Sequence, residues 1–495
     1  MNDTSLSRIR NIVLNPVYCV SAYFVFFLIN QMQIVNLYLG PTQSFLVLWA
    51  GINIVYFLVK DRSFFRVPAF VLLLPLLVAA GITFLVNRDV APVTQIKSAV
   101  LFSIALLLVY PLGARIARSE NRHRELAIAV LPALIVTFIQ AVLSFGTLIV
   151  LYSFRGRYAG KVMMLGLQQF IYGGGSHATI LFGFNVDSNH AALFSLVSLI
   201  LTVWAYYYRR QIFGASWVEK HAKLIQRLFW LNAVLQSCFF ILAFSRGAML
   251  TLMVTTVIFT PLYVMLWEKT KGVGKNSFKK RLRHSVVVLL ICFVAITGIQ
   301  TLVRDVTNEY VDIVQRITWI PKHKTEDVPD EELSFSKGDA TRSARTIIWE
   351  ETLLLWQEYP VFGVGPYNSQ HYAKEANITS EANYLQRGAV PHNSYLDVLV
   401  YYGAVGFVLY IVFFLRYMTC LWKRFAKTGF DFEDLSLSSM VIVIMLGVFF
   451  LTDSFVGFDY LFGTLLIGLG YLVAKSSVEH GKLPMISYAS PPKER

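Results

Sequence analysis

The sequence has little charge. Asp, Glu, Lys and Arg together make up 15% of its 495 residues, whereas soluble domains carry about a quarter. Apolar residues and Tyr make up 56%, and the mean hydropathy is +0.55. This balance excludes a water-soluble globular enzyme, and the long apolar runs exclude a disordered chain. The sequence is therefore that of an integral membrane protein.

Cysteine is also scarce, and common catalytic motifs are missing. The four cysteines lie inside apolar stretches and form no CxxC pair, which argues against a disulfide framework and against a zinc site. The chain has no HExxH, no Walker A and no GxSxG pattern. We therefore expect no metal, no cofactor and no nucleotide hydrolysis.

Twelve apolar segments are long enough to cross a bilayer, since a spanning helix needs about 20 mostly apolar residues. They cover residues 13–33, 43–59, 67–86, 96–114, 126–152, 189–207, 228–244, 247–267, 285–303, 403–422, 436–453 and 458–474. Lys and Arg collect in alternate loops, whereas the opposite short loops 34–42 and 454–457 have none. By the positive-inside rule, both termini are expected in the cytoplasm.

A long hydrophilic segment, residues 303–391, falls on the outer side in this topology. It holds 9 Lys and Arg against 14 Asp and Glu, so the net charge of +14 comes from the cytoplasmic loops and gives no support to nucleic-acid binding. Within it, residues 346–359 space their apolar side chains as a helix does, and Pro360 ends the pattern.

We expect an all-α polytopic membrane protein with about 12 transmembrane helices and a large helical outer loop between spans nine and ten. Its four parts are nine spans in 1–302, the outer loop 303–391, three spans in 392–475, and a cytoplasmic tail in 476–495.

Arginines at the outer ends of apolar helices are the first candidates for chemistry, because charge is expensive in hydrocarbon. Arg246 lies in a short break between spans seven and eight, although a tight turn with an arginine reaching the lipid headgroups would look the same. Arg342 and Arg345 lie in the outer loop, with Trp349 one turn after Arg345. They could be ordinary solvated charges, but a cation at a helix start opposes the helix dipole.

A histidine lies where the outer loop re-enters the membrane. His392 and Asn393 are followed by Asp397 and by the tenth span, and a second outer loop contributes Arg157. A lone histidine is more often structural than catalytic, but this one is expected on the same side as the arginines. The planar fork of arginine suits phosphate oxygens. The pattern therefore predicts a phosphorylated, lipid-linked substrate.

Three motifs resemble those of the bacterial O-antigen ligase and O-antigen polymerase superfamily. The turn at 244–250 contains an Arg-x3-Leu element beginning at Arg246. Residues 345–365 combine an Arg, a Trp one turn later and a terminal Pro-x-x-Gly-x-Gly. His392-Asn393 is followed by nine residues, Gly403, two residues and Gly406, which matches the ligase pattern.

The resemblance implies a GT-C-like glycosyltransferase in the bacterial inner membrane with its active site in the periplasm. It would transfer a completed glycan from undecaprenyl pyrophosphate to a sugar hydroxyl of lipid A-core, with inversion and without metal or ATP. By the same resemblance, Arg246 and Arg345, with Arg342, bind the pyrophosphate, and His392 serves the acceptor as the catalytic base, with Asp397 as the alternative base. Further substrate-binding candidates are Arg157, Trp349 and Asn393.

Other functions stay open at the level of sequence. A polymerase or a protein O-oligosaccharyltransferase of the same superfamily differs only in its acceptor. A 12-span transporter fits the span number, but transporters usually place ionisable groups near the bilayer midplane, whereas here the polar groups collect at one face. A scaffold without catalysis would leave the clustered arginines without a role.

Overall fold

The computed structural model describes residues 10–32, 40–67, 70–158, 161–171, 177–185, 187–270, 278–317, 344–380, 383–451 and 460–479. Ten helices in these ranges are long and apolar enough to cross a membrane, and two shorter apolar helices, Pro16–Asn30 and Phe70–Val86, stand at two further predicted spans. Each of the twelve predicted spans thus has its helix. The predicted all-α polytopic membrane fold is confirmed.

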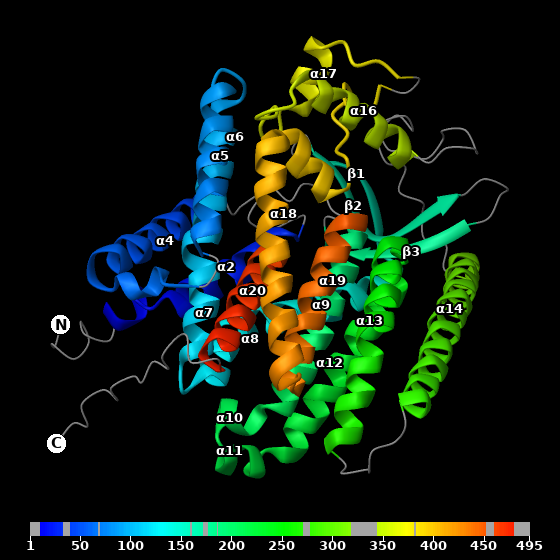
Figure 1. The fold of residues 1–495 in the computed structure, drawn as a ribbon. Helices are drawn as coiled ribbons and strands as arrows, with labels where there is room; N and C mark the ends of the chain where they lie inside the picture. The colour runs from blue at the N-terminus through cyan, green and yellow to red at the C-terminus, as the bar shows by residue number, and fades with distance from the viewer. Residues whose placement is uncertain are drawn as a thin grey trace, which may run out of the picture.

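The following helices form one bundle (Figure 1). They are α2 (Pro16–Asn30), α4 (Gly40–Lys60), α5 (Leu73–Val86), α6 (Pro92–Ile104), α7 (Tyr110–Arg118), α8 (Arg122–Ile149), α9 (Ser188–Tyr207), α12 (Ala222–Leu242), α13 (Arg246–Thr270), α14 (Phe278–Ile317), α18 (Ser394–Thr428), α19 (Phe432–Leu451) and α20 (Tyr460–Glu479). Short helical segments are η1 (Arg62–Phe65), η2 (Phe70–Leu72) and η3 (Ala105–Val109).

Two pairs of short helices mark the ends of the bundle. Helices α16 (Ala344–Glu358) and α17 (Ser369–Glu375) lie at one end, which we call the cap end. Helices α10 (Arg209–Phe213) and α11 (Ala215–Lys220) lie at the other, which we call the base end (Figure 1).

Glycines allow the central helices to touch. Helix α20 is buried from Tyr460 to Ser476 and lies against α7. A Cβ atom on Gly113 would lie 2.2 Å from the carbonyl oxygen of Ile467, and one on Gly470 would lie 2.2 Å from that of Tyr110. Small residues at helix crossings permit this approach in membrane proteins. The two glycines therefore allow the backbones of α7 and α20 to pack directly against each other at the centre of the bundle.

A cluster of buried charges joins helices at the base end. The Lys475 ammonium of α20 lies 2.7 Å from an Asp431 oxygen, 2.9 Å from Glu433 and 3.1 Å from Asp434. Lys475, Glu433 and Asp434 are each at most 2% exposed. Burial by itself raises the pKa of Asp431, but the Lys475 charge and the hydrogen bonds from Lys475 and Asp434 together outweigh burial, so the pKa is lowered. The cluster ties the start of α19 to the end of α20.

A three-stranded antiparallel sheet occupies the loop between α8 and α9, which the sequence analysis did not predict. Its strands, in the order β1-β2-β3, are β1 (Ser153–Tyr158), β2 (Lys161–Ile171) and β3 (His177–Gly183). Leu167 and Leu181 of the sheet pack with Phe239 and Leu242 of α12. A search for 20-residue apolar runs overlooks strands, which are short and alternate their side chains between two faces.

The predicted boundary between residues 302 and 303 falls inside helix α14, which continues to Ile317. The segment that was predicted to form the outer loop therefore begins within a helix, not after one. Val303 and Val311 pack against the apolar cluster beneath the sheet, and the Asn308 side chain accepts the backbone N–H of Thr179 at 2.9 Å. Charged residues interrupt the apolar face of α14 after residue 303, so the apolar run in the sequence ends before the helix does.

Candidate active site at the cap end

The predicted outer helix is α16, which ends two residues before Pro360. Its apolar face is buried: Ile348, Thr352 and Leu355 are each at most 2% exposed. This face packs on α18. Helix α16 is thus fixed to the bundle, and the side chains beside its buried face have defined positions.

Trp349 connects α16 to the segment directly before His392. Its indole N–H donates to the carbonyl oxygen of Pro391 at 2.7 Å. Arg345 is four residues before Trp349 in the same helix, and side chains at this spacing are neighbours on the helix surface. Arg345, Trp349 and His392 are all half-buried. The structure therefore brings the second and third motifs together, with Arg345 about one helical turn from the Pro391 contact.

His392 has an unusual backbone conformation, with φ at +51°. Directly after it, the Asn393 side chain accepts the backbone N–H groups of Tyr395 at 3.1 Å and Leu396 at 3.4 Å, so it caps the start of α18. Asp397, in the first turn of that helix, is completely buried. Asn393 thus has a structural role, and its predicted contact with substrate stays a prediction.

The Pro-x-x-Gly-x-Gly loop after α16 packs against a break in α18. Helical geometry stops at Gly403, which has φ +65° and ψ −170°. Across the break, Ala404 N–H donates to Pro360 at 2.8 Å and Val405 N–H to Val361 at 3.3 Å. The return bonds run from residues 364 and 365 to the carbonyls of residues 400 and 401, at 2.9 and 3.0 Å. Glycines of two separate motifs thus lie at one set of four backbone hydrogen bonds, which we call the junction.

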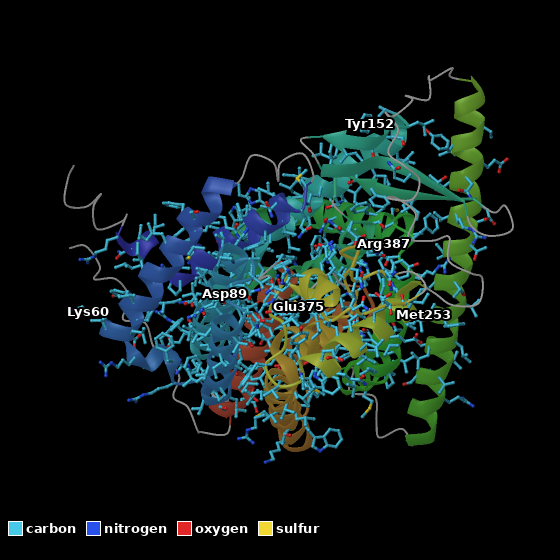
Figure 2. The ribbon with its side chains drawn as sticks, turned by 90° about the horizontal axis from the view of Figure 1, so that it is seen from above. Lys60, Asp89, Tyr152, Met253, Glu375 and Arg387 are labelled. Atoms are coloured by element: carbon cyan, nitrogen blue, oxygen red, sulfur yellow. The ribbon has the colours of Figure 1, made fainter. Side chains whose placement is uncertain are left out.

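Polar side chains of α5 and α6 hold the same loop, and the sequence analysis missed them. The Thr83 hydroxyl donates to the carbonyl of Phe362 at 2.8 Å, and the Gln95 amide donates to that of Pro366 at 2.7 Å. Both side chains are buried. Figure 2 shows this region from above, with Glu375 of α17 over the bundle beside the α5–α6 turn at Asp89. A buried polar residue in an apolar span needs a partner, which was the available signal.

Glu351 is a second residue that sequence reasoning missed. It lies on the buried side of α16 and is 1% exposed. Its carboxylate accepts the backbone N–H groups of Tyr384 at 3.1 Å and Leu385 at 2.7 Å, and also the hydroxyl of Ser380. This carboxylate therefore anchors the chain between α17 and His392.

The break that was predicted at Ser245–Gly247 is found between α12 and α13 and covers residues 243–245. Phe244 has φ +45°, and the Ser245 hydroxyl accepts the backbone N–H of Ala248 at 3.2 Å. Arg246 is the first residue of α13 and is exposed. Because the end of α12 packs beneath the sheet, the break lies at the cap end. Helix α19 contacts both α13 and α18, and so links this motif to the one at His392.

Both described motif arginines stand in the first turn of a helix. Arg246 is the first residue of α13 and Arg345 the second of α16. A cation at this position is unfavourable by about 0.3–1 kcal/mol, whereas the free N–H groups of a helix start attract an anion. A bound anion would turn this penalty into attraction, which favours a phosphate ligand at both helix starts.

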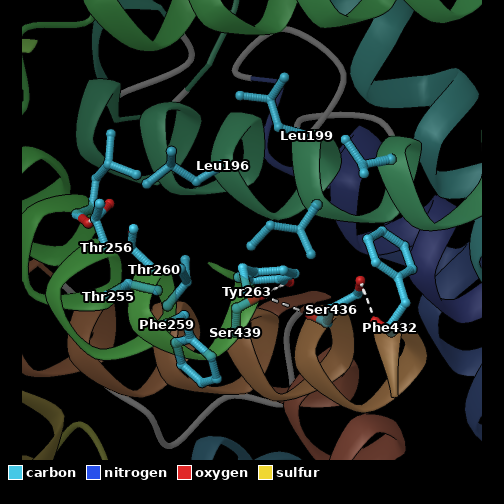
Figure 3. Close-up of a pocket in the computed structure, with 14 residues that line it drawn as sticks. Leu196, Leu199, Thr255, Thr256, Phe259, Thr260, Tyr263, Phe432, Ser436 and Ser439 are labelled. Atoms are coloured by element: carbon cyan, nitrogen blue, oxygen red, sulfur yellow. Dashed lines mark hydrogen bonds between the residues drawn. The ribbon is translucent and has the colours of Figure 1, made fainter. Parts of the chain in front are cut away.

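A cavity of about 320 Å³ lies between α9, α13 and α19. Figure 3 shows its mixed lining, with Leu196 and Phe259 beside a row of hydroxyl groups. The hydroxyl of Tyr263 lies 3.4 Å from that of Ser439. The lining begins on α13 at Leu252, six residues or about 9 Å along the helix from Arg246.

Two predicted arginines are not placed. Arg157 belongs to β1, where it pairs with Val162, but its side chain lies outside the described residues, and so does the whole of Arg342. Their roles stay predictions. Within the described ranges, no group of three or more His, Cys, Asp or Glu side chains could hold a metal ion.

The fold and this site define a polytopic α-helical membrane protein. At its cap end, Arg246 and Arg345 lie in the first turns of two helices, and His392 lies just before a third. Residues 231–411 match the family model described as O-antigen ligase. This part of the chain is therefore similar to the family that the three motifs resemble, which confirms the resemblance. The match runs from α12 into α18 and contains all three motifs. No curated protein matches the chain.

Proposed function

We propose that the protein is an O-antigen ligase. It transfers a completed glycan from undecaprenyl pyrophosphate to a sugar hydroxyl of lipid A-core, at the periplasmic face of the bacterial inner membrane. The observation that carries this proposal is the position of Arg246 and Arg345 in the first turns of α13 and α16, both within the family match. Each guanidinium group and each helix start suits a phosphate group, and a diphosphate has two of them.

The proposed reaction is a direct displacement at the anomeric carbon of the donor. The acceptor oxygen forms the new glycosidic bond as the bond to the pyrophosphate oxygen breaks, which inverts the configuration. Arg246 and Arg345 stabilise the negative charge that grows on the leaving pyrophosphate. The glycosyl pyrophosphate supplies the free energy, so no nucleotide takes part.

His392 is the proposed base that removes the acceptor proton. It is half-buried and keeps surface for an acceptor, whereas Asp397 is 0% exposed. Its left-handed backbone also fits a functional position, because strained residues persist where the surrounding structure holds them for a purpose. These two observations favour His392 over Asp397.

The donor's polyprenyl chain has a suitable cavity nearby. The space between α9, α13 and α19 begins about 9 Å along α13 from Arg246 and is lined mainly by apolar side chains. A pyrophosphate at Arg246 would thus have an apolar path for its tail toward the bilayer interior. We therefore propose that the cap end faces the periplasm, and the Lys- and Arg-rich loops at the base end support this orientation.

The variant Arg246→Lys tests the proposal. A lysine keeps the charge but cannot make two parallel hydrogen bonds to a phosphate, so transfer should fall about hundredfold or more. The measurement is glycan transfer between purified donor and acceptor. Arg387→Lys is the matched control, because Arg387 is an exposed arginine of the cap end outside the motifs. Undiminished transfer by Arg246→Lys would remove this residue from the mechanism.

The acceptor needs a separate test in a strain without the gene. Loss of a ligase leaves lipid A-core without attached polymer. Loss of a polymerase leaves core that carries a single repeat, and this result would contradict the ligase assignment.

A further inference from the structure

A second cavity lies at the base end, far along the bundle from Arg246 and His392. It has a volume of about 710 Å³ and is lined by residues of α2, α8, α10 and α11. Polar groups at its mouth come from Asn121, Arg124 and Gln211, and Trp217 forms part of its wall. Nothing in the proposed transfer reaction uses this space.

An apolar groove of about 380 Å³ lies beside this cavity, between α8, α9 and α12. The two share Leu131, Phe213 and Trp217 as lining residues. Along α8 the combined lining runs from Asn121 to Phe138, which is 17 residues or about 25 Å. One leaflet of a bilayer, headgroups included, is about 20–22 Å thick. The site thus has the length of one lipid molecule.

The polar end of this site is positively charged. Arg124 is exposed at the mouth and forms no ion pair with an acidic residue of the described chain. The Arg209 guanidinium lies 4.3 Å from the centre of the Tyr206 ring and donates to the Tyr206 carbonyl at 2.6 Å, which fixes its position at the edge of the groove. Its remaining N–H groups are available to a ligand.

The flanking segment extends this positive charge. Residues 209–227 hold five Lys and Arg and one Glu. Phe213 and Trp217 of the short helices α10 and α11 are each 44% exposed, as expected of helices at a membrane surface.

We propose that this site binds an anionic phospholipid of the leaflet at the base end. Its phosphate lies between Arg124 and Arg209, and one acyl chain fills the groove along α8. The terminal segments of the chain itself are poor alternatives, because residues 1–9 have no net charge and residues 480–495 carry a net charge of +2. Neither would complement a basic pocket.

The experiment compares phospholipids on the full-length, delipidated protein in detergent. Binding of phosphatidylglycerol and phosphatidylcholine is measured for the wild type, Arg124→Gln and Arg210→Gln. Arg210 is the matched control: it is an exposed arginine beside Arg209 that pairs with Glu219 at 3.5 Å and does not line either space. We expect phosphatidylglycerol to bind about tenfold more tightly than phosphatidylcholine. Arg124→Gln should remove most of this difference, and Arg210→Gln should preserve it.

A second pair of measurements separates the headgroup from the chain. Ile135 is 60% exposed on the groove wall, so Ile135→Trp should fill the groove without unfolding the protein and should weaken binding of both lipids. Free glycerol phosphate should compete poorly. Equal binding of the two lipids, an unaffected Arg124→Gln variant or full competition by glycerol phosphate would overturn the proposal. So would a disulfide between Trp217→Cys and a second cysteine introduced within residues 1–9 or 480–495, because the chain would then occupy the cavity itself.

Discussion

Replacement of Gly403 by alanine should disrupt the junction between the two glycine motifs. A Cβ atom at this position would lie 2.2 Å from the carbonyl oxygen of Val361 and 2.6 Å from the nitrogen of Phe362. Both contacts are with backbone atoms, so no side-chain rotation relieves them. The backbone angles, φ +65° and ψ −170°, are also open almost only to glycine.

The size of the effect follows from these contacts. The strained backbone of a non-glycine residue costs about 1–3 kcal/mol. Relief of the overlap requires the loop to move away, which breaks up to four backbone hydrogen bonds across the junction. At about 0.5–1.5 kcal/mol each, they contribute about 2–6 kcal/mol. The sum is comparable with the stability of a whole domain, so we expect the 360–365 loop to detach from α18.

The assays for this variant are thermal unfolding of the purified protein in detergent and glycan transfer. Gly81→Ala is the control, because Gly81 lies within α5 and a Cβ atom there would meet nothing within 4 Å. Gly81→Ala should be neutral or slightly stabilising, since alanine favours a helix by about 1 kcal/mol over glycine. An unfolding temperature and a transfer rate equal to wild type in Gly403→Ala would refute the junction described above.

Two further substitutions test other parts of the structure. Trp349→Phe removes the indole N–H that donates to the carbonyl of Pro391, the residue before His392. It should lower kcat for transfer and keep donor affinity, because the position of His392 is then less fixed. A loss of donor affinity as large as the loss of kcat would indicate that Trp349 contacts the donor directly. Lys475→Met leaves Glu433 and Asp434 buried without their ammonium and should destabilise the protein by about 3–5 kcal/mol in chemical unfolding, whereas a loss below 1 kcal/mol would show that the cluster contributes little to stability.

The bundle was predictable because its signals are local. Each span is a run of apolar residues, and each loop carries its charge bias in a few neighbouring residues. The break at Arg246 was visible for the same reason, since three polar or small residues interrupt two apolar runs. The start of α16 and its end before Pro360 also follow from local spacing and from proline geometry.

The contacts of the site depend on residues far apart in the chain, and single-sequence patterns do not give such pairs. Nothing local in Thr83 indicates that it meets Phe362, and nothing local in Glu351 indicates that it accepts N–H groups of residues 384 and 385. Asn393 shows the opposite case. Its position after a histidine in a motif indicated substrate binding, whereas a standard capping rule already predicted the role that the structure gives it.

The most direct test of the proposed site separates donor binding from transfer in one set of preparations. Equilibrium binding of undecaprenyl pyrophosphate and the rate of glycan transfer are measured for the wild type, Arg246→Lys and His392→Ala. If arginine holds the pyrophosphate and histidine activates the acceptor, Arg246→Lys should lose about tenfold or more in donor affinity. His392→Ala should bind donor normally and lose about hundredfold or more in transfer. Normal donor binding by Arg246→Lys, or normal transfer by His392→Ala, would contradict the account.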